Sequence, residues 1–146
     1  MKLNQLSVFL ENKPGRLSYP CKALADAGIN ILTLSLADTH QFGILRLIVR
    51  DWPKAKAALE KAGCVVNVTE VVAIEVPDRP GGLADVLAML EKAGTNVEYM
   101  YAFTFRSKDK AIIVFRFDDP DAGIKLLQDK GVNVIGGVEL YARAGE

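Results

Sequence analysis

The sequence predicts an α+β protein made of two tandem units, each with the element order β-α-β-β-α-β and an antiparallel sheet. Two observations support this prediction. The chain of 146 residues repeats its turn and helix-end residues at an offset of about 66 positions. Within each copy, short β-rich runs alternate with segments of helical periodicity. The expected domains are residues 1–69 and residues 70–146.

The repeat is clearest at a Pro-Gly turn near the start of each copy. Residues 12–17 read Asn-Lys-Pro-Gly-Arg-Leu, and residues 78–83, 66 positions later, read Asp-Arg-Pro-Gly-Gly-Leu. The same offset relates the Ala-Gly pair at residues 27–28 to the pair at residues 93–94. Agreement by chance at so many turn and cap positions is improbable, so the sequence indicates two copies of one unit of roughly seventy residues.

Each copy opens with a β-rich run, at residues 5–10 and 71–76, that stops at the Pro-Gly turn. A helix is expected after each turn, because apolar residues then recur at helical spacing. Gly28 and Gly94 suit the ends of these helices, where a left-handed residue is favoured. A hairpin follows in each copy, formed by residues 29–37 with 42–50 and by residues 97–105 with 111–117.

Pro53 and Pro120 mark the expected starts of the second helices, and Gly63 and Gly131 mark their ends. A final β-rich stretch is expected to close each unit. This order is the split β-α-β, or ferredoxin-like, pattern, in which two helices pack on one face of an antiparallel sheet.

One strand of each hairpin carries an apolar stripe, and the two stripes fall on opposite faces. In the second copy the stripe is aromatic and comprises Tyr99, Tyr101, Phe103 and Phe105. The equivalent positions of the first copy hold Thr33, Ser35, Ala37 and Thr39. Its leucines at positions 32, 34 and 36 point the other way. Burial of the stripes in a core or a subunit interface is favoured over contact with a ligand. The helix-free face of at least one half is therefore expected to contact another surface.

Composition excludes several classes of function. The chain has 18 Lys and Arg against 18 Asp and Glu, and a net charge of zero removes the broad attraction that dominates binding to nucleic acid or anionic membranes. No apolar stretch is long enough to span a bilayer. Cys21 and Cys64 lie outside any metal-ligand spacing and are expected to be reduced and buried. The expectation is a soluble cytoplasmic protein that binds neither nucleic acid nor membrane.

The sequence lacks a catalytic constellation. His40 is the only histidine and lies in an expected hairpin turn. Asp118 and Asp119 precede a proline and are expected to cap a helix. No metal motif, phosphate loop or dinucleotide fingerprint occurs. The sequence therefore predicts a protein that is not an enzyme and needs neither metal nor cofactor.

The two Pro-Gly turns are the candidate functional sites. Gly15 and Gly81 would let a ligand approach the backbone, and the helix that follows offers free N–H groups to a carboxylate. Acceptors for an ammonium group stand nearby in each copy, namely Asn12 with Asn30 and Asp78 with Asn96. This chemistry fits a free amino acid. The alternative is that each Pro-Gly pair only turns the chain and each Asn only caps local backbone.

Both turn motifs resemble those of ACT domains. Residues 12–17 followed by Ala-Gly-Ile-Asn-Ile at 27–31 resemble one such domain, and residues 78–83 followed by Ala-Gly-Thr-Asn-Val at 93–97 resemble a second. Together they cover almost the whole chain, which is similar to the small stand-alone tandem ACT proteins of prokaryotes. The resemblance implies a regulatory module that binds amino acids at interfaces between ACT units and associates as a homodimer or larger oligomer.

The resemblance also implies which residues contact the ligand: Asn12, Gly15, Arg16, Leu17 and Asn30 in the first copy, and Asp78, Gly81, Gly82, Leu83 and Asn96 in the second. The copies differ where Asn12 becomes Asp78 and Arg16 becomes Gly82, so the two turns need not bind the same ligand. Any regulated metabolic enzyme is expected to be a separate polypeptide or absent.

Three functional hypotheses follow. The leading one is a non-catalytic amino-acid sensor. The second is a module that binds no ligand and docks a metabolic enzyme through its sheet face. The third interprets the aromatic strand as an RNA-stacking platform, but residues 43–48 and 111–116 lack the expected RNA-binding pattern and the net charge is zero. A small phosphatase of similar fold would have only Arg16 near a helix start to support it.

Overall fold

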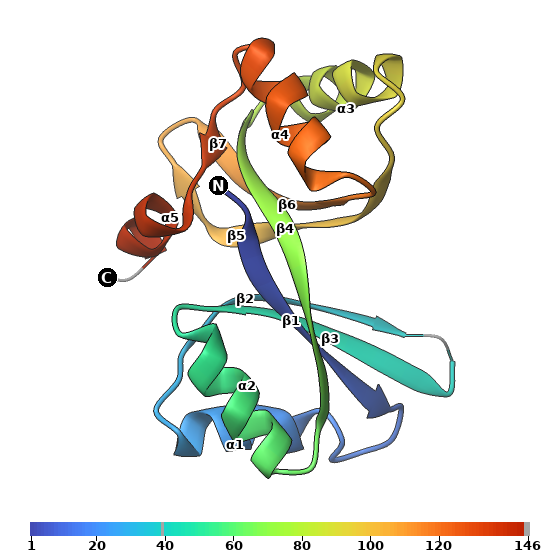
Figure 1. The fold of residues 1–146 in the computed structure, drawn as a ribbon, viewed down its shortest axis with the longest axis vertical. Coiled ribbons are helices and arrows are strands. Elements are labelled where there is room, and N and C mark those ends of the chain that lie inside the picture. Colours follow the sequence, from blue (N-terminus) through green and yellow to red (C-terminus); the bar gives the residue numbers. More distant parts are fainter. Residues whose placement is uncertain (39, 145–146) are drawn as a thin grey trace. The chain divides into compact units, whose positions relative to one another are not determined.

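The structure is a computed structural model that describes residues 1–38 and 40–144, apart from the side chains of residues 105–107. The chain forms two compact units. One, here called the amino-terminal unit, is Asn4–Thr69, and the other, the carboxy-terminal unit, combines Met1–Leu3 with Glu70–Glu146. Each unit follows the order β-α-β-β-α-β, which confirms the α+β class and the two ferredoxin-like units (Figure 1).

In the amino-terminal unit, two helices accompany a sheet of antiparallel pairs with the strand order β2-β3-β1-β4. Its elements are β1 (Leu3–Glu11), α1 (Ser18–Asp26), β2 (Ile31–Asp38), β3 (Phe42–Val49), α2 (Trp52–Lys61) and the first part of β4 (Val65–Pro77). Strand β4 continues along the chain into the carboxy-terminal unit.

In the carboxy-terminal unit, β4 pairs with both β6 and β7, and β5 pairs with β6. The elements after β4 are α3 (Gly82–Lys92), β5 (Val97–Ser107), β6 (Lys110–Phe117), α4 (Pro120–Asp129), β7 (Val134–Ile135) and α5 (Gly137–Ala144).

The expectation that a β-rich stretch closes the second copy is wrong beyond two residues. Strand β7 ends at Ile135, and helix α5 follows at once. Leu140 of α5 is fully buried, and Arg143 donates a hydrogen bond of 2.9 Å to Glu75 on β4. These contacts, together with the ion pair between Arg143 and Glu139 one turn earlier, hold the last segment as a helix.

Each unit has its own core on the side of the sheet that faces its first two helices. In the amino-terminal unit, alternate residues of β1 and β3 pack with Leu24 of α1 and Leu59 of α2. In the carboxy-terminal unit, Phe115 and Phe117 of β6 pack with Leu90 and Leu127. Each fully buried side chain of this size contributes about 2 kcal/mol, which gives each unit a stable frame for its Pro-Gly turn.

The predicted second helices and their caps are present. Helix α2 begins at Trp52, one residue before Pro53, and α4 begins at Pro120. The carboxylate of Asp119 accepts a hydrogen bond of 3.2 Å from the Ala122 amide, so this residue caps the helix as expected. Asp51 accepts the equivalent bond, of 3.1 Å, in the amino-terminal unit.

The two apolar stripes do lie on opposite sides of their sheets. Leu34 and Leu36 pair with Leu47 and Leu45, which are core residues, so the leucines share the helix side. They are nevertheless 49% and 51% exposed, because β2 ends the strand order.

The aromatic stripe faces away from α3 and α4. Tyr101 pairs with Val114, and the neighbouring Phe115 is the residue that faces those helices. Phe103 is buried, at 7% exposed. Thr39 and the side chain of Phe105, both named in the stripe comparison, lie outside the described residues. Among the described residues, no helix is long and apolar enough to cross a membrane.

Candidate functional site

A cavity of about 390 Å³ opens beside the Pro-Gly turn of the amino-terminal unit. We call it the turn cavity. It is lined by the end of β1, by the turn itself, by Leu17, and by Leu36, Asp38 and Gly43 of the β2–β3 hairpin. Three of the predicted site residues, Asn12, Gly15 and Leu17, therefore line one cavity.

The backbone of the turn explains why Gly15 is required. Its φ is +83°, in the left-handed region that residues with a side chain rarely adopt. The Arg16 amide donates to the Lys13 carbonyl at 3.2 Å, and the Gly15 carbonyl accepts from the Tyr19 amide at 3.2 Å. The chain thus reverses tightly and enters α1 at Ser18. A Cβ on Gly15 would meet no atom within 4 Å, so the backbone conformation is what selects glycine here.

The turn is held to the hairpin that forms the other side of the turn cavity. The Asn12 amide donates to the Gln41 carbonyl at 2.9 Å, and its side-chain Nδ2 donates to the His40 carbonyl at 3.0 Å. His40 lies in the hairpin turn as expected, with a φ of +78°. Asn12 keeps a side-chain amide oxygen, which can accept a hydrogen bond from a ligand.

The turn cavity combines positive, negative and apolar groups. Lys13 brings a cation to its lining, and the amides of Leu17 and Ser18 make no backbone hydrogen bond among the described residues. Free amides at a helix start favour a carboxylate. Asp38 adds a carboxylate on the facing hairpin, while Leu10, Leu17 and Leu36 supply apolar surface. The arrangement can hold both charges of a zwitterion with an apolar side chain.

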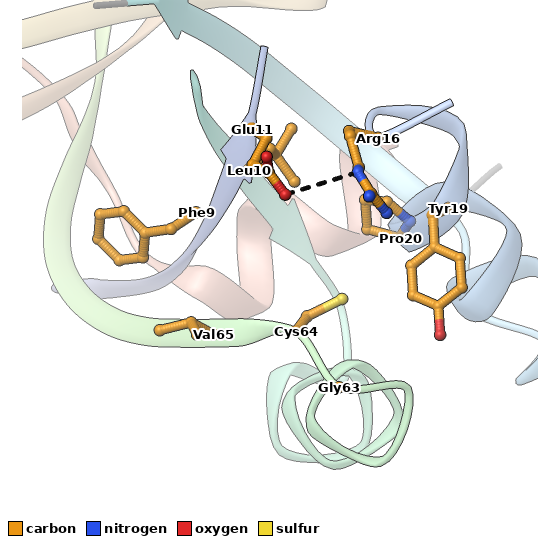
Figure 2. A pocket seen from close by; sticks show the side chains of 9 residues that line it. All are labelled: Phe9, Leu10, Glu11, Arg16, Tyr19, Pro20, Gly63, Cys64 and Val65. Carbon is orange, nitrogen blue, oxygen red and sulfur yellow. Dashed lines mark ion pairs between the residues drawn. The ribbon is translucent and has the colours of Figure 1, made fainter. Parts of the chain in front are cut away.

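Arg16 does not line the turn cavity. It lines a second cavity, of about 210 Å³, with residues of β1, α1 and the connection from α2 to β4 (Figure 2). We call this the Arg16 cavity. Leu10 and Glu11 contribute to both cavities.

Glu11 is shared between the two cavities through ion pairs. Its carboxylate lies 3.1 Å from Lys13 Nζ and 3.8 Å from Arg16 Nε. The hydrogen bond from Lys13, together with the charges of both cations, lowers the pKa of Glu11 below its ordinary value. Glu11 therefore stays ionised at neutral pH, and two cations compete for one carboxylate.

Asn30 is not brought to either cavity. It is exposed in the two-residue gap before β2, after the Ile29 amide has closed the end of α1 by donating to the Leu24 carbonyl at 2.9 Å. Its predicted role as an ammonium acceptor therefore has no support from the geometry of a single chain.

The Pro-Gly turn of the carboxy-terminal unit repeats the backbone but not the surroundings. Gly81 has a φ of +86°, and the Asp78 amide donates to the Asp109 carbonyl at 2.9 Å, as Asn12 does to Gln41. Helix α3, however, begins at Gly82, the counterpart of Arg16. A Cβ on Gly82 would lie 2.0 Å from the Pro77 carbonyl oxygen, so no side chain fits there.

The two other predicted residues of this second turn, Leu83 and Asn96, lie in different surroundings. Leu83 packs against the core of its unit. Asn96 is exposed, and its amide donates to Asp118 at 3.2 Å. The cation of this turn, Arg79, is occupied by an ion pair of 3.4 Å with Asp85 and a hydrogen bond to the Pro80 carbonyl.

The cysteines add no second chemistry to the site. Cys21 and Cys64 are free and partly buried, and burial raises the pKa of the Cys64 thiol. Among the described residues, no group of three or more His, Cys, Asp or Glu side chains could hold a metal ion.

Comparison with protein families shows to which family the chain belongs. Residues 1–142 match the family described as an ACT domain pair. The chain belongs to this family. A comparison with curated proteins finds no match.

Solved structures agree with this assignment of the ACT pair. Protein BT0572 from Bacteroides thetaiotaomicron is 42% identical, with 97% of this chain and 96% of that chain covered and a TM-score of 0.89. The regulatory subunit of aspartate kinase from Thermus flavus has a TM-score of 0.59 at 17% identity, over 86% of this chain and 90% of that one.

The regulatory subunit of aspartate kinase from Thermus thermophilus, in its ligand-free form, has a TM-score of 0.61 at 16% identity, over 86% and 91% of the two chains. At these identities the likeness shows that the two regulatory subunits share the fold of the ACT pair.

Several lining residues of the ACT pair were missed by sequence reasoning. Lys13 lies within the turn motif and could have been found from its position between Asn12 and Gly15. Asp38 and Leu36 could not, because only the pairing of β2 with β3 and the hydrogen bonds from Asn12 bring the hairpin to the turn.

Proposed function

We propose that this ACT domain pair is a non-catalytic sensor that binds a free amino acid in the turn cavity of its amino-terminal unit. The observation that carries the proposal is the placement of Lys13 and of Leu17, the residue just before α1, in one cavity with Asp38 and Asn12. Such a lining complements a carboxylate and an ammonium group carried by one α-carbon. The shared fold with regulatory subunits of aspartate kinase is consistent with this role.

Each group of the amino acid has a proposed partner. The carboxylate lies at the start of α1, near Lys13, where Gly15 lets it approach the backbone. The ammonium group lies between Asp38 and the side-chain oxygen of Asn12. The side chain contacts the leucines of the cavity, Leu10, Leu17 and Leu36. We place the ligand at this turn because Lys13, Asp38 and Asn12 line one cavity there.

A second copy of the chain is proposed to complete the site. Leu36 lines the turn cavity yet is 51% exposed, and its neighbour on the same face, Leu34, is 49% exposed. A homodimer that covers β2 would bury both leucines and enclose the ligand. A ligand that contacts both copies would bind the dimer more tightly than the monomer, and this difference in affinity would favour the dimer.

Thermal unfolding against the twenty common amino acids tests the proposal. An amino acid present at 100 times its Kd adds about 2.7 kcal/mol to the free energy of unfolding and raises the melting temperature. Asp38→Asn should abolish that increase, because it removes the negative charge that pairs with the ammonium group. Asp26→Asn is the matched control, since Asp26 is an exposed acid on α1 that lines neither cavity. No shift with any amino acid would contradict the proposal.

An alternative function is a module that binds no ligand and docks a metabolic enzyme through its sheet. Phe9, Phe42 and Val65 favour it, since they are 43%, 57% and 64% exposed. Phe9 and Val65 adjoin core residues along their strands, and Phe42 pairs with Glu11, so all three face away from the helices. Under this alternative, Phe42→Glu abolishes capture of the enzyme while the amino-acid panel gives no thermal shift.

A further inference from the structure

The Arg16 cavity has walls from three parts of the amino-terminal unit. They are the end of β1, the first turn of α1, and residues 63–65 between α2 and β4 (Figure 2). One hydrogen bond joins α1 to the connection after α2: the Tyr19 hydroxyl donates to the Ala62 carbonyl at 2.6 Å. The Cys64 amide closes the end of α2 by donating to the Leu59 carbonyl at 2.9 Å. The cavity is therefore built into the packed unit.

The lining of the Arg16 cavity combines apolar side chains with the ion pair between Arg16 and Glu11. Leu10 and Pro20 give it aliphatic surface, and Tyr19 gives it aromatic surface. Phe9 and Val65 border it from the strands, with their side chains pointing away from Arg16 (Figure 2). Such a surface favours a ligand with an apolar body.

Arg16 is available to an anion. Its side chain makes no hydrogen bond within the described part of the chain, and its Nε lies 3.8 Å from the Glu11 carboxylate, beyond hydrogen-bond distance. Glu11 is held more closely by Lys13, at 3.1 Å. The three side chains together carry one excess positive charge. A guanidinium in this state can bind a carboxylate through two parallel hydrogen bonds.

The same lining disfavours an ammonium group. Among the residues that the structure describes, Glu11 is the only acid that lines the Arg16 cavity, and it is already neutralised by two cations. The turn cavity, in contrast, contains Asp38. The smaller volume, about 210 Å³ against about 390 Å³, also favours a smaller ligand.

We propose that the Arg16 cavity is a second ligand site, which binds a small apolar monocarboxylate by its carboxylate to Arg16 and by its hydrocarbon body to the lining from β1 and α1. This site is separate from the proposed amino-acid site. The two adjoin at Glu11, but each has its own cation.

Isovalerate is a suitable probe because two close analogues separate the contributions. Isovaleramide has the same shape without the charge, and valine is isovalerate with an added α-ammonium group. Titration of the full chain, followed by amide chemical shifts, should give saturable shifts at residues 9–11, 19–22 and 63–65 with isovalerate. We expect isovaleramide and valine to bind this cavity at least about tenfold more weakly, since a charge-assisted bidentate pair is lost or an unpaired ammonium is added.

Two variants test the role of Arg16. Arg16→Gln should weaken isovalerate binding by about tenfold or more without changing the melting temperature of the unliganded protein, because this side chain is exposed. Lys22→Gln removes an exposed cation from α1, the helix that follows Arg16, and should leave isovalerate binding unchanged. Isovalerate should also slow alkylation of Cys64, measured by peptide mass, more than that of Cys21, because only Cys64 lines the cavity.

Three outcomes would overturn the inference. They are equal binding of isovalerate and isovaleramide, unchanged binding by Arg16→Gln, and shifts confined to the turn cavity at residues 36–43. Asp38→Asn separates this inference from the proposed function, since it should abolish the effect of the amino acid and leave isovalerate binding intact.

Discussion

The two Pro-Gly turns have the same backbone and different surroundings. Gly15 and Gly81 have φ values of +83° and +86°, and each turn is tied to its hairpin by a hydrogen bond of 2.9 Å. At the next position, Arg16 extends a charged side chain, whereas Gly82 packs against the Pro77 carbonyl. Duplication has thus kept the hydrogen bonds that make the turn, while the side chains that could bind a ligand have diverged.

The largest expected effect concerns Gly82. Gly82→Ala places a Cβ 2.0 Å from the Pro77 oxygen and 3.0 Å from its carbonyl carbon, and backbone atoms cannot move aside as a flexible side chain can. We expect a loss of roughly 3 kcal/mol in the free energy of unfolding, measured by urea denaturation. Arg16→Ala is the matched change at the equivalent position and should leave stability unchanged. Similar losses in the free energy of unfolding for Gly82→Ala and Arg16→Ala would contradict the difference in packing between these two positions.

The next effect concerns α5, which has no counterpart in the amino-terminal unit. Glu75, only 10% exposed, accepts hydrogen bonds from Arg143 at 2.9 Å and Asn133 at 3.0 Å, and Lys110 lies 3.7 Å away. Burial alone would raise the pKa of Glu75, but the bonds from Arg143 and Asn133 and the nearby cations lower it overall. Glu75→Gln should therefore cost about 2 kcal/mol near neutral pH.

The pH dependence of that cost follows from the lowered pKa. A carboxylate whose pKa is lower in the folded state stabilises the fold above its unfolded pKa, and loses this contribution as the pH falls through the folded value. Urea unfolding should show that the difference in free energy of unfolding between wild type and Glu75→Gln becomes smaller at acidic pH. A gap that stays constant down to about pH 2 would mean that the carboxylate charge does not hold α5.

The smallest effect tests the equivalence of the two turns. Gly15→Ala and Gly81→Ala each force a side chain into the left-handed region, at about 1 kcal/mol. Both should lower the free energy of unfolding by similar amounts, since neither added Cβ meets an atom closer than 3.7 Å. A difference of more than about twofold between the losses would contradict the claim that the two backbones are equivalent.

The element order and the turns could be predicted from sequence because they depend on local chemistry. Glycines with positive φ end α1 and α3, and Asp119 caps α4 through an amide three residues away. The prediction failed for the last segment because its β-rich start, Val134–Ile135, pairs for only two residues, and the helix that follows is held to β4 by the bond from Arg143 to Glu75, a residue far along the chain.

The site was partly predictable for the same reason. Asn12, Gly15 and Leu17 share one motif and line one cavity. Arg16 belongs to that motif, yet it lines another cavity, because residues 63–65 approach from the far end of α2. Sequence spacing cannot reveal which side of a turn a distant connection will cover.

The central claim is that an amino acid binds at one turn and not at the other. Amide chemical shifts, recorded while the full chain is titrated with the amino acid that most raises its melting temperature, test it most directly. The account predicts saturable shifts at Gly15, Leu17 and Asp38, with those of Gly81 and Leu83 unchanged. Equal shifts at both turns, or shifts at residues 81–83 alone, would contradict it.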